Sequence, residues 1–148
     1  AKFDVRINGH AMDISSFFSW GGLSKFRKLE SQKVVFYARF VLHALENNEL
    51  LGFMNSLSHF ARVGNLVLLE FRTPEDDGLA KATSQHFRRG VAKSWVEDYL
   101  HTCGFDILES SEGQGFARFG SDNAFVARLA ARKTRHVFEP EQLPRLVR

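Results

Sequence analysis

The sequence has little cysteine, little proline and no long apolar run. Its 148 residues include one cysteine, Cys103, and three prolines. A single cysteine excludes an internal disulfide and a cysteine-based zinc site, and it fits a reducing compartment. No apolar run reaches the roughly 18 residues that a membrane-spanning helix needs. We therefore expect a cytoplasmic protein without a membrane span.

The chain also lacks a strong charge of either sign. Lys and Arg number 20 against 17 Asp and Glu, which gives a formal net charge of +3. The basic residues are spread along the chain, with small clusters at Arg88-Arg89 and Arg132-Lys133. A nucleic-acid-binding surface needs a basic stripe or patch. The dispersed charge therefore argues against a nucleic-acid partner.

Nothing in the composition departs from an ordinary globular domain, with 44% hydrophobic and 25% charged residues. No signal peptide opens the sequence. The chain starts at Ala1 rather than at a methionine, so we expect that its natural start was trimmed or lies upstream. We predict one domain over residues 1–133 and a tail over 134–148, where two of the prolines stand.

The first third of the chain predicts strand, helix and strand. Residues 3–7 alternate apolar and polar side chains, which indicates a short strand. Asp13 or Ser15 is a suitable cap for a helix that extends to Leu29. The apolar run 34–37 is typical of a buried strand in a parallel sheet.

The middle of the chain repeats this alternation. Apolar residues between Leu50 and Phe60 recur with the helical period, and the run 66–71 predicts a second buried strand. Residues 73–90 are polar and predict a long loop, which in a compact domain is usually functional or mobile.

The last third predicts a helix followed by two strands. Ser94 and Glu97 form a capping-box pattern that would begin the helix, and Gly104 would end it in the left-handed conformation. Residues 105–110 and 124–131 are expected to be strands, with a turn and an edge strand between them. The whole order indicates an α/β fold: parallel strands, an antiparallel C-terminal hairpin at one edge, and helices on both faces.

Several sequence segments are similar to one family. The order of elements resembles the C-terminal part of the class I S-adenosylmethionine-dependent methyltransferase fold, from its third strand to its seventh. The run Val-Phe-Tyr-Ala-Arg-Phe-Val-Leu-His-Ala-Leu at 35–45 resembles the fourth-strand segment of a bacterial subgroup, some of whose members are attached to surface-polysaccharide enzymes. Residues 66–72 resemble its fifth strand, and 86–89 and 113–117 resemble later segments.

The resemblance implies a partial fold. The family's first strand, glycine-rich cofactor loop, first helix and second strand are absent from this sequence. That loop lets the backbone approach the cofactor, as in dinucleotide-binding sites. S-adenosylmethionine is thus the implied cofactor, and an upstream domain or partner chain is implied at the exposed edge of the sheet.

The resemblance also suggests which residues bind the cofactor. His10 stands where the family usually has an acidic residue that accepts from the adenine amino group, and Asp13 follows three residues later. A neutral imidazole nitrogen is able to accept the same hydrogen bond. The backbone around Ala38 and Arg39 would line the methionine arm.

The acceptor side would lie at the carboxyl ends of the strands, where open α/β sheets bind ligands. Arg39, Arg72 and Arg88 are predicted to bind the acceptor, a small molecule or a glycan. His43, Glu70 and His86 are the catalytic candidates; a histidine is suited to act as a base near neutral pH. They also have a structural interpretation, in which Arg39 pairs with Glu70 across adjacent strands and His43 caps the next helix.

Two functions remain open. The first is a methyltransferase module completed by upstream sequence, and the second is a non-catalytic methyltransferase-like domain that mediates assembly through its exposed strand edge. A nucleic-acid module is supported only by the basic character of the chain. The six histidines form no His-x-x-x-His pair or facial triad, which argues against a metal site.

Overall fold

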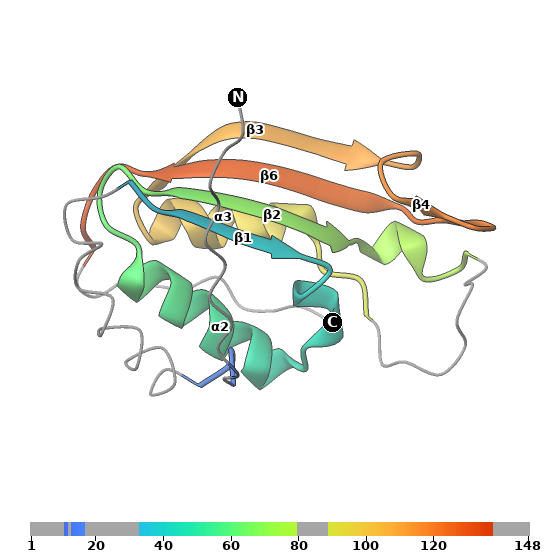
Figure 1. Cartoon of the computed structure of the whole chain (residues 1–148), viewed down its shortest axis with the longest axis horizontal. Coiled ribbons are helices and arrows are strands. Elements are labelled where there is room, and N and C mark those ends of the chain that lie inside the picture. Colours follow the sequence, from blue (N-terminus) through green and yellow to red (C-terminus); the bar gives the residue numbers. More distant parts are fainter. Residues whose placement is uncertain (1–10, 12, 17–32, 80–88, 138–148) are drawn as a thin grey trace, which may run out of the picture.

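A twisted four-stranded sheet forms the centre of the molecule (Figure 1). The computed structural model describes residues 11, 13–16, 33–79 and 89–137. The sheet order is β1-β2-β6-β3, and the strands are β1 (Val35–Arg39), β2 (Leu66–Arg72), β6 (Val126–Lys133) and β3 (Phe105–Gly113). The strand expected at 3–7, the helix expected from 17 to 29 and most of the predicted tail lie outside the described residues.

The topology confirms the predicted mixture of parallel and antiparallel pairing. Strands β1 and β2 are parallel, and helix α2 (Asn47–Phe60) connects them. Strand β6 is antiparallel to both of its neighbours, β2 and β3. The last two long strands therefore form the expected antiparallel hairpin, with β6 inside the sheet and β3 at its edge.

The two described helices pack on one face of the sheet. Helix α3 (Lys93–Thr102) lies beside α2, and the Tyr99 hydroxyl donates to Asn55 Oδ1 at 2.5 Å across the helix pair. Alternation along β2 explains the packing, because Val67, Leu69 and Phe71 turn toward the helices and are buried. One hydrophobic cluster joins these strand residues to Leu50, Phe53, Met54 and Leu57 of α2 and to Trp95, Val96, Tyr99 and Leu100 of α3. No helix in the described part of the chain has the length and apolar character to cross a membrane.

The helix ends correct one prediction and confirm another. The capping box at Ser94 and Glu97 is wrong: the N-cap position of α3 is Ala92, two residues before Ser94, and it has no side-chain cap. Glu97 instead accepts from Lys93 Nζ at 3.0 Å and from the Ser110 hydroxyl, because a charge-assisted partner competes with the free backbone N–H. Gly104 adopts φ +80° as predicted.

A capping box is present in α2, where the sequence did not suggest one. The Glu46 N–H donates to Glu49 Oε2 at 2.8 Å, and the Glu46 side chain accepts from the backbone in return. A Glu at the cap position is not among the preferred residues, so the local sequence does not indicate this box.

The predicted loop after β2 begins with a 3-10 turn, η3 (Pro74–Asp76). Residues 80–88 lie outside the described part. Between β3 and β6, a small hairpin pairs β4 (Arg118–Phe119) with β5 (Asp122–Asn123). Gly113 and Gly115 precede this hairpin, and Gly115 has φ +87°, as expected for the predicted turn.

Candidate functional site at the carboxyl ends of β1 and β2

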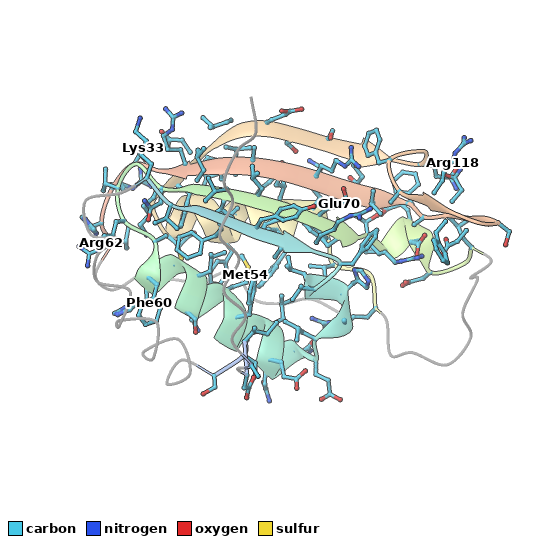
Figure 2. The ribbon with its side chains drawn as sticks, viewed as in Figure 1. Lys33, Met54, Phe60, Arg62, Glu70 and Arg118 are labelled. Atoms are coloured by element: carbon cyan, nitrogen blue, oxygen red, sulfur yellow. The ribbon has the colours of Figure 1, made fainter. Side chains whose placement is uncertain are left out.

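The carboxyl ends of β1 and β2 bring Arg39 and Glu70 together. The two residues are register partners, and Arg39 Nε donates to Glu70 Oε1 at 2.8 Å. Arg128 of β6, the register partner of Glu70 on its other side, donates from Nε to Oε2 at 2.7 Å. One buried carboxylate therefore holds two guanidinium groups, and its place toward the end of β2 is visible in Figure 2.

The pairing keeps Glu70 ionised. Burial raises the pKa of the Glu70 carboxyl, but the hydrogen bonds from Arg39 and Arg128 outweigh this and leave its pKa below the ordinary value. Both oxygens are engaged. In this arrangement the carboxylate is suited to orient cations, and it is poorly suited to exchange protons near neutral pH.

Replacing Glu70 by glutamine is expected to lower the free energy of unfolding by about 1–2 kcal/mol, because the amide has one acceptor oxygen and its NH2 group only donates, so one of the two arginine bonds is lost. Both arginine side chains are half exposed, so solvent screens the ion pairs and makes this loss of stability smaller than for a fully buried pair. Since the folded pKa of Glu70 is depressed, its contribution is present above the unfolded pKa and is lost as pH falls through the folded pKa. Urea denaturation of both proteins at pH 7 and pH 3 measures this. A difference that stays constant with pH would contradict the assignment.

An aromatic ring packs against each of the two guanidinium groups that bind Glu70. The Arg39 guanidinium carbon lies 5.0 Å from the Phe40 ring centroid, and that of Arg128 lies 5.0 Å from the Phe116 centroid. Arg128 Nη2 also donates to the Phe116 carbonyl oxygen at 2.7 Å. The two cations are therefore fixed in position by stacking as well as by Glu70.

Phe40 has a strained backbone at the end of β1. Its φ is +58°, and it is the one residue other than glycine with a positive φ among the described residues. Such a conformation costs about 1–3 kcal/mol and is concentrated at functional sites. The sequence contains no signal for it, because a phenylalanine after a strand does not predict the left-handed region.

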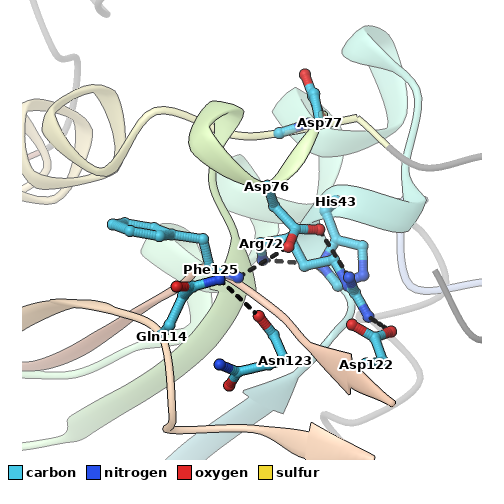
Figure 3. Close-up of polar contacts among 9 residues, drawn as sticks. His43, Arg72, Asp76, Asp77, Gln114, Asp122, Asn123 and Phe125 are labelled. Carbon is cyan, nitrogen blue, oxygen red and sulfur yellow. Dashed lines mark hydrogen bonds and ion pairs between the residues drawn. The ribbon is translucent and has the colours of Figure 1, made fainter. Parts of the chain in front are cut away.

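Arg72 occupies a second, deeper cluster (Figure 3). Its guanidinium donates from Nη1 to Asp76 Oδ2 and from Nη2 to Asp122 Oδ2, each at 2.7 Å. The Phe125 N–H donates to the other oxygen of Asp76 at 2.8 Å. The cluster ties the end of β2 to η3 and to the β4-β5 hairpin, and it places two carboxylates around the predicted acceptor-binding arginine.

His43 lies in the 3-10 turn η2 (Leu42–Ala44) and is almost fully buried. Its Nδ1 accepts the backbone N–H of Arg72 at 3.1 Å, so a neutral ring carries its proton on Nε2. Its ring meets Phe40 edge to face at 5.5 Å between centroids. The alternative in which His43 caps the next helix is wrong, because Glu46 and Glu49 cap α2.

The other predicted site residues are not part of these clusters. Ala38 is buried in the core under the sheet. Asp13 accepts from the Ser15 N–H at 2.9 Å and from its hydroxyl at 2.6 Å, so it forms a local turn. His10, His86 and Arg88 lie outside the described residues. In the described part of the chain, no group of three or more His, Cys, Asp or Glu side chains is arranged to hold a metal ion.

Comparison with known proteins gives distant structural similarity only. No protein-family model and no curated protein sequence matches the chain. One similar structure is the Burkholderia thailandensis 1,6-didemethyltoxoflavin-N1-methyltransferase with bound 1,6-didemethyltoxoflavin and S-adenosylhomocysteine. The similarity has 13% identity and a TM-score of 0.48, and it covers 68% of this chain and 44% of that one.

A second similar structure comes from work on the conversion of a disulfide bond into a thioacetal group during echinomycin biosynthesis. It has 13% identity and a TM-score of 0.49, with 84% of this chain and 55% of that chain covered. The present chain thus spans about half the length of these proteins. Similarity at this level identifies neither the cofactor nor the acceptor.

Proposed function

We propose that this chain is the C-terminal part of a class I S-adenosylmethionine-dependent methyltransferase, completed by upstream sequence or by a partner chain. The observation that carries the proposal is the sheet order β1-β2-β6-β3 with an antiparallel β6 between β2 and β3. An antiparallel last strand inserted in this way distinguishes the methyltransferase sheet from other doubly wound sheets.

The open edge of β1 supports completion by further strands. Val34 O accepts the Leu66 N–H at 3.0 Å, and the Phe40 N–H donates to Glu70 O at 2.7 Å. Backbone groups in a strand alternate in direction, so those of Val35, Tyr37 and Arg39 point away from β2. Among the described strands, none pairs with this edge. An unpaired edge of a parallel sheet invites another strand.

The described residues fit the acceptor side of such an enzyme better than its cofactor side. The bound cofactor would supply a methyl group already activated on its sulfonium, so the protein mainly needs to align the acceptor. In our proposal Arg39, Arg72 and Arg88 bind the acceptor, Glu70 orients it, and His86 accepts its proton. The one acceptor nitrogen of a neutral His43 is already bonded to the Arg72 N–H, so His43 positions the end of β2 instead. His10, Asp13 and the backbone at Ala38 and Arg39 contribute to the cofactor site.

A glycan acceptor and a bacterial origin linked to surface-polysaccharide enzymes belong to this proposal through the sequence resemblance. A cytoplasmic location belongs to it through the single cysteine. The alternative is a non-catalytic domain that uses the same open edge for assembly. That function predicts no affinity for the cofactor.

Calorimetric titration with S-adenosylmethionine tests the proposal. We expect the native chain with its upstream sequence to bind with a dissociation constant on the order of micromolar, equivalent to roughly 8 kcal/mol. The 148-residue chain should bind at least about a hundredfold more weakly, because it lacks the loop that approaches the cofactor. Absence of binding to the longer chain would refute the enzyme and leave the assembly domain.

A further inference from the structure

The sheet face opposite the helices carries an ordered pattern of side chains. Strand register places residues of neighbouring strands in transverse rows on this face. The row at the carboxyl ends of β1 and β2 is charged and consists of Arg39, Glu70, Arg128 and Ser111. The next row is largely apolar and consists of Tyr37, Leu68, Ala130 and Glu109.

An open hollow of about 340 Å³ lies over parts of both rows. Arg39 is not in its lining and is joined to it through the bond to Glu70. Tyr37, Leu68, Glu70, Glu109 and Arg128 contribute to its lining. Tyr37 and Leu68 are exposed despite their apolar surface. The hollow therefore combines an apolar floor with a charged end, which is the usual composition of a small-molecule site.

The charged end has an excess of positive charge and free donors. Two guanidiniums share the single carboxylate of Glu70, and their side chains remain 51% and 46% exposed. Arg39 bonds through Nε alone, and Arg128 uses Nε and Nη2. Within the described part of the chain, both Nη atoms of Arg39 and the Nη1 of Arg128 have no hydrogen-bond partner.

The free donors are also held in place. Stacking on Phe40 and Phe116 and the bonds to Glu70 fix both guanidinium groups, so a ligand would not have to order them. A planar, pre-oriented guanidinium binds a carboxylate or phosphate through paired hydrogen bonds. Arg72 differs, because two carboxylates surround it and its side chain is only 11% exposed.

We infer that Arg39 and Arg128 bind a carboxylate or phosphate group of a ligand whose ring lies over Tyr37 and Leu68. The ligand class is a ring-bearing anion. The inference rests on the proposed function only in identifying this ligand with the methyl acceptor. Arg128 is then an acceptor-binding residue in addition to those predicted from the sequence.

Titration of the 148-residue chain with phenyl phosphate, followed by NMR of the arginine Nε–H signals, tests the inference without any cofactor. We expect the signals of Arg39 and Arg128 to shift together, with inorganic phosphate binding several-fold more weakly. Arg39→Gln and Arg128→Gln should each weaken binding at least about tenfold. Arg118→Gln, at an exposed arginine of the β4-β5 hairpin, is the matched control and should leave affinity unchanged.

Glu70→Gln makes the sharpest test because its expected effect has the opposite sign. Removal of the neutralising carboxylate should strengthen phenyl phosphate binding about tenfold. Unchanged affinity in the Arg39→Gln and Arg128→Gln variants, or no gain in Glu70→Gln, would overturn the site. Equal affinity for phenyl phosphate and inorganic phosphate would overturn the role of the apolar row. Because no S-adenosylmethionine is present, none of these failures would coincide with failure of the proposed enzyme.

Discussion

Replacement of Arg72 by methionine is expected to lower the free energy of unfolding by about 3–5 kcal/mol, the usual cost of leaving a buried ion pair without one partner. The Arg72 guanidinium balances two carboxylates whose side chains are only 2% and 7% exposed. In the variant, Asp76 would still accept the hydrogen bond from the Phe125 N–H. Asp122 would lose the bond to its Oδ2, and its Oδ1 already has no partner among the described residues. Urea denaturation at pH 7 measures the loss.

A second substitution separates loss of charge from loss of packing. Adding Asp122→Asn to the Arg72→Met variant should recover at least about 1 kcal/mol, because one uncompensated charge disappears. Arg118→Met is the matched exposed control, and its expected change is within about 0.5 kcal/mol. An Arg72→Met variant as stable as this control would contradict the structural role of the cluster.

The sequence was sufficient to predict the elements that have a strong local pattern. The apolar runs at 34–37 and 66–71 became β1 and β2, and the helical period from Leu50 to Phe60 became α2. The expected burial is wrong for β1, where Val35 and Tyr37 are exposed. The Arg39–Glu70 pair could also be predicted as the structural interpretation of these residues. This pair can be predicted because consecutive parallel strands of a βαβ unit end at the same edge of the sheet.

Arg128 and Phe116 could not be placed from the sequence. The position of Arg128 depends on the antiparallel register of β6 against β2, which pairs it with Glu70. A shift of one residue moves every side chain to the other face, and no local pattern in the sequence fixes this register. The second guanidinium at Glu70 is therefore a tertiary feature.

The Ser94–Glu97 prediction failed for a related reason. The spacing was suitable for a capping box, but Glu97 lies within reach of Lys93 and of Ser110 on β3. Ser110 is brought there only by the packing of α3 on the sheet. A partner from another element thus decided the role of a residue whose local pattern suggested a different one.

Lys133 is the second position where a large loss of stability is expected, and its role is structural. It is 2% exposed, and its Nζ donates to Ser58 O at 3.2 Å and to Cys103 O at 2.6 Å. Burial lowers the pKa of Lys133. The two carbonyls lie at the C-terminal ends of α2 and α3, where free carbonyl groups and the helix dipole favour a cation.

Lys133→Met should cost about 2 kcal/mol, because methionine keeps most of the volume but leaves both carbonyl groups unbonded. Lys133→Ala should cost about 3–4 kcal/mol, since it also opens a cavity beside the Phe105 ring, which lies 4.6 Å from Nζ. The loss of stability in Lys133→Met measures the hydrogen bonds, and the additional loss in Lys133→Ala measures the packing.

Amide hydrogen exchange then locates the effect of the Lys133 variants. If Lys133 joins the two helix ends, the last turns of α2 and α3 should exchange faster in Lys133→Met, while the strands β1 and β2 keep their native protection relative to global unfolding. Uniform acceleration over the whole chain would mean that Lys133 contributes only to global stability. Protection that is unchanged at both helix ends would refute the link between them. The same measurement on Arg118→Met, far from either helix end in sequence, provides the baseline for a substitution on the surface.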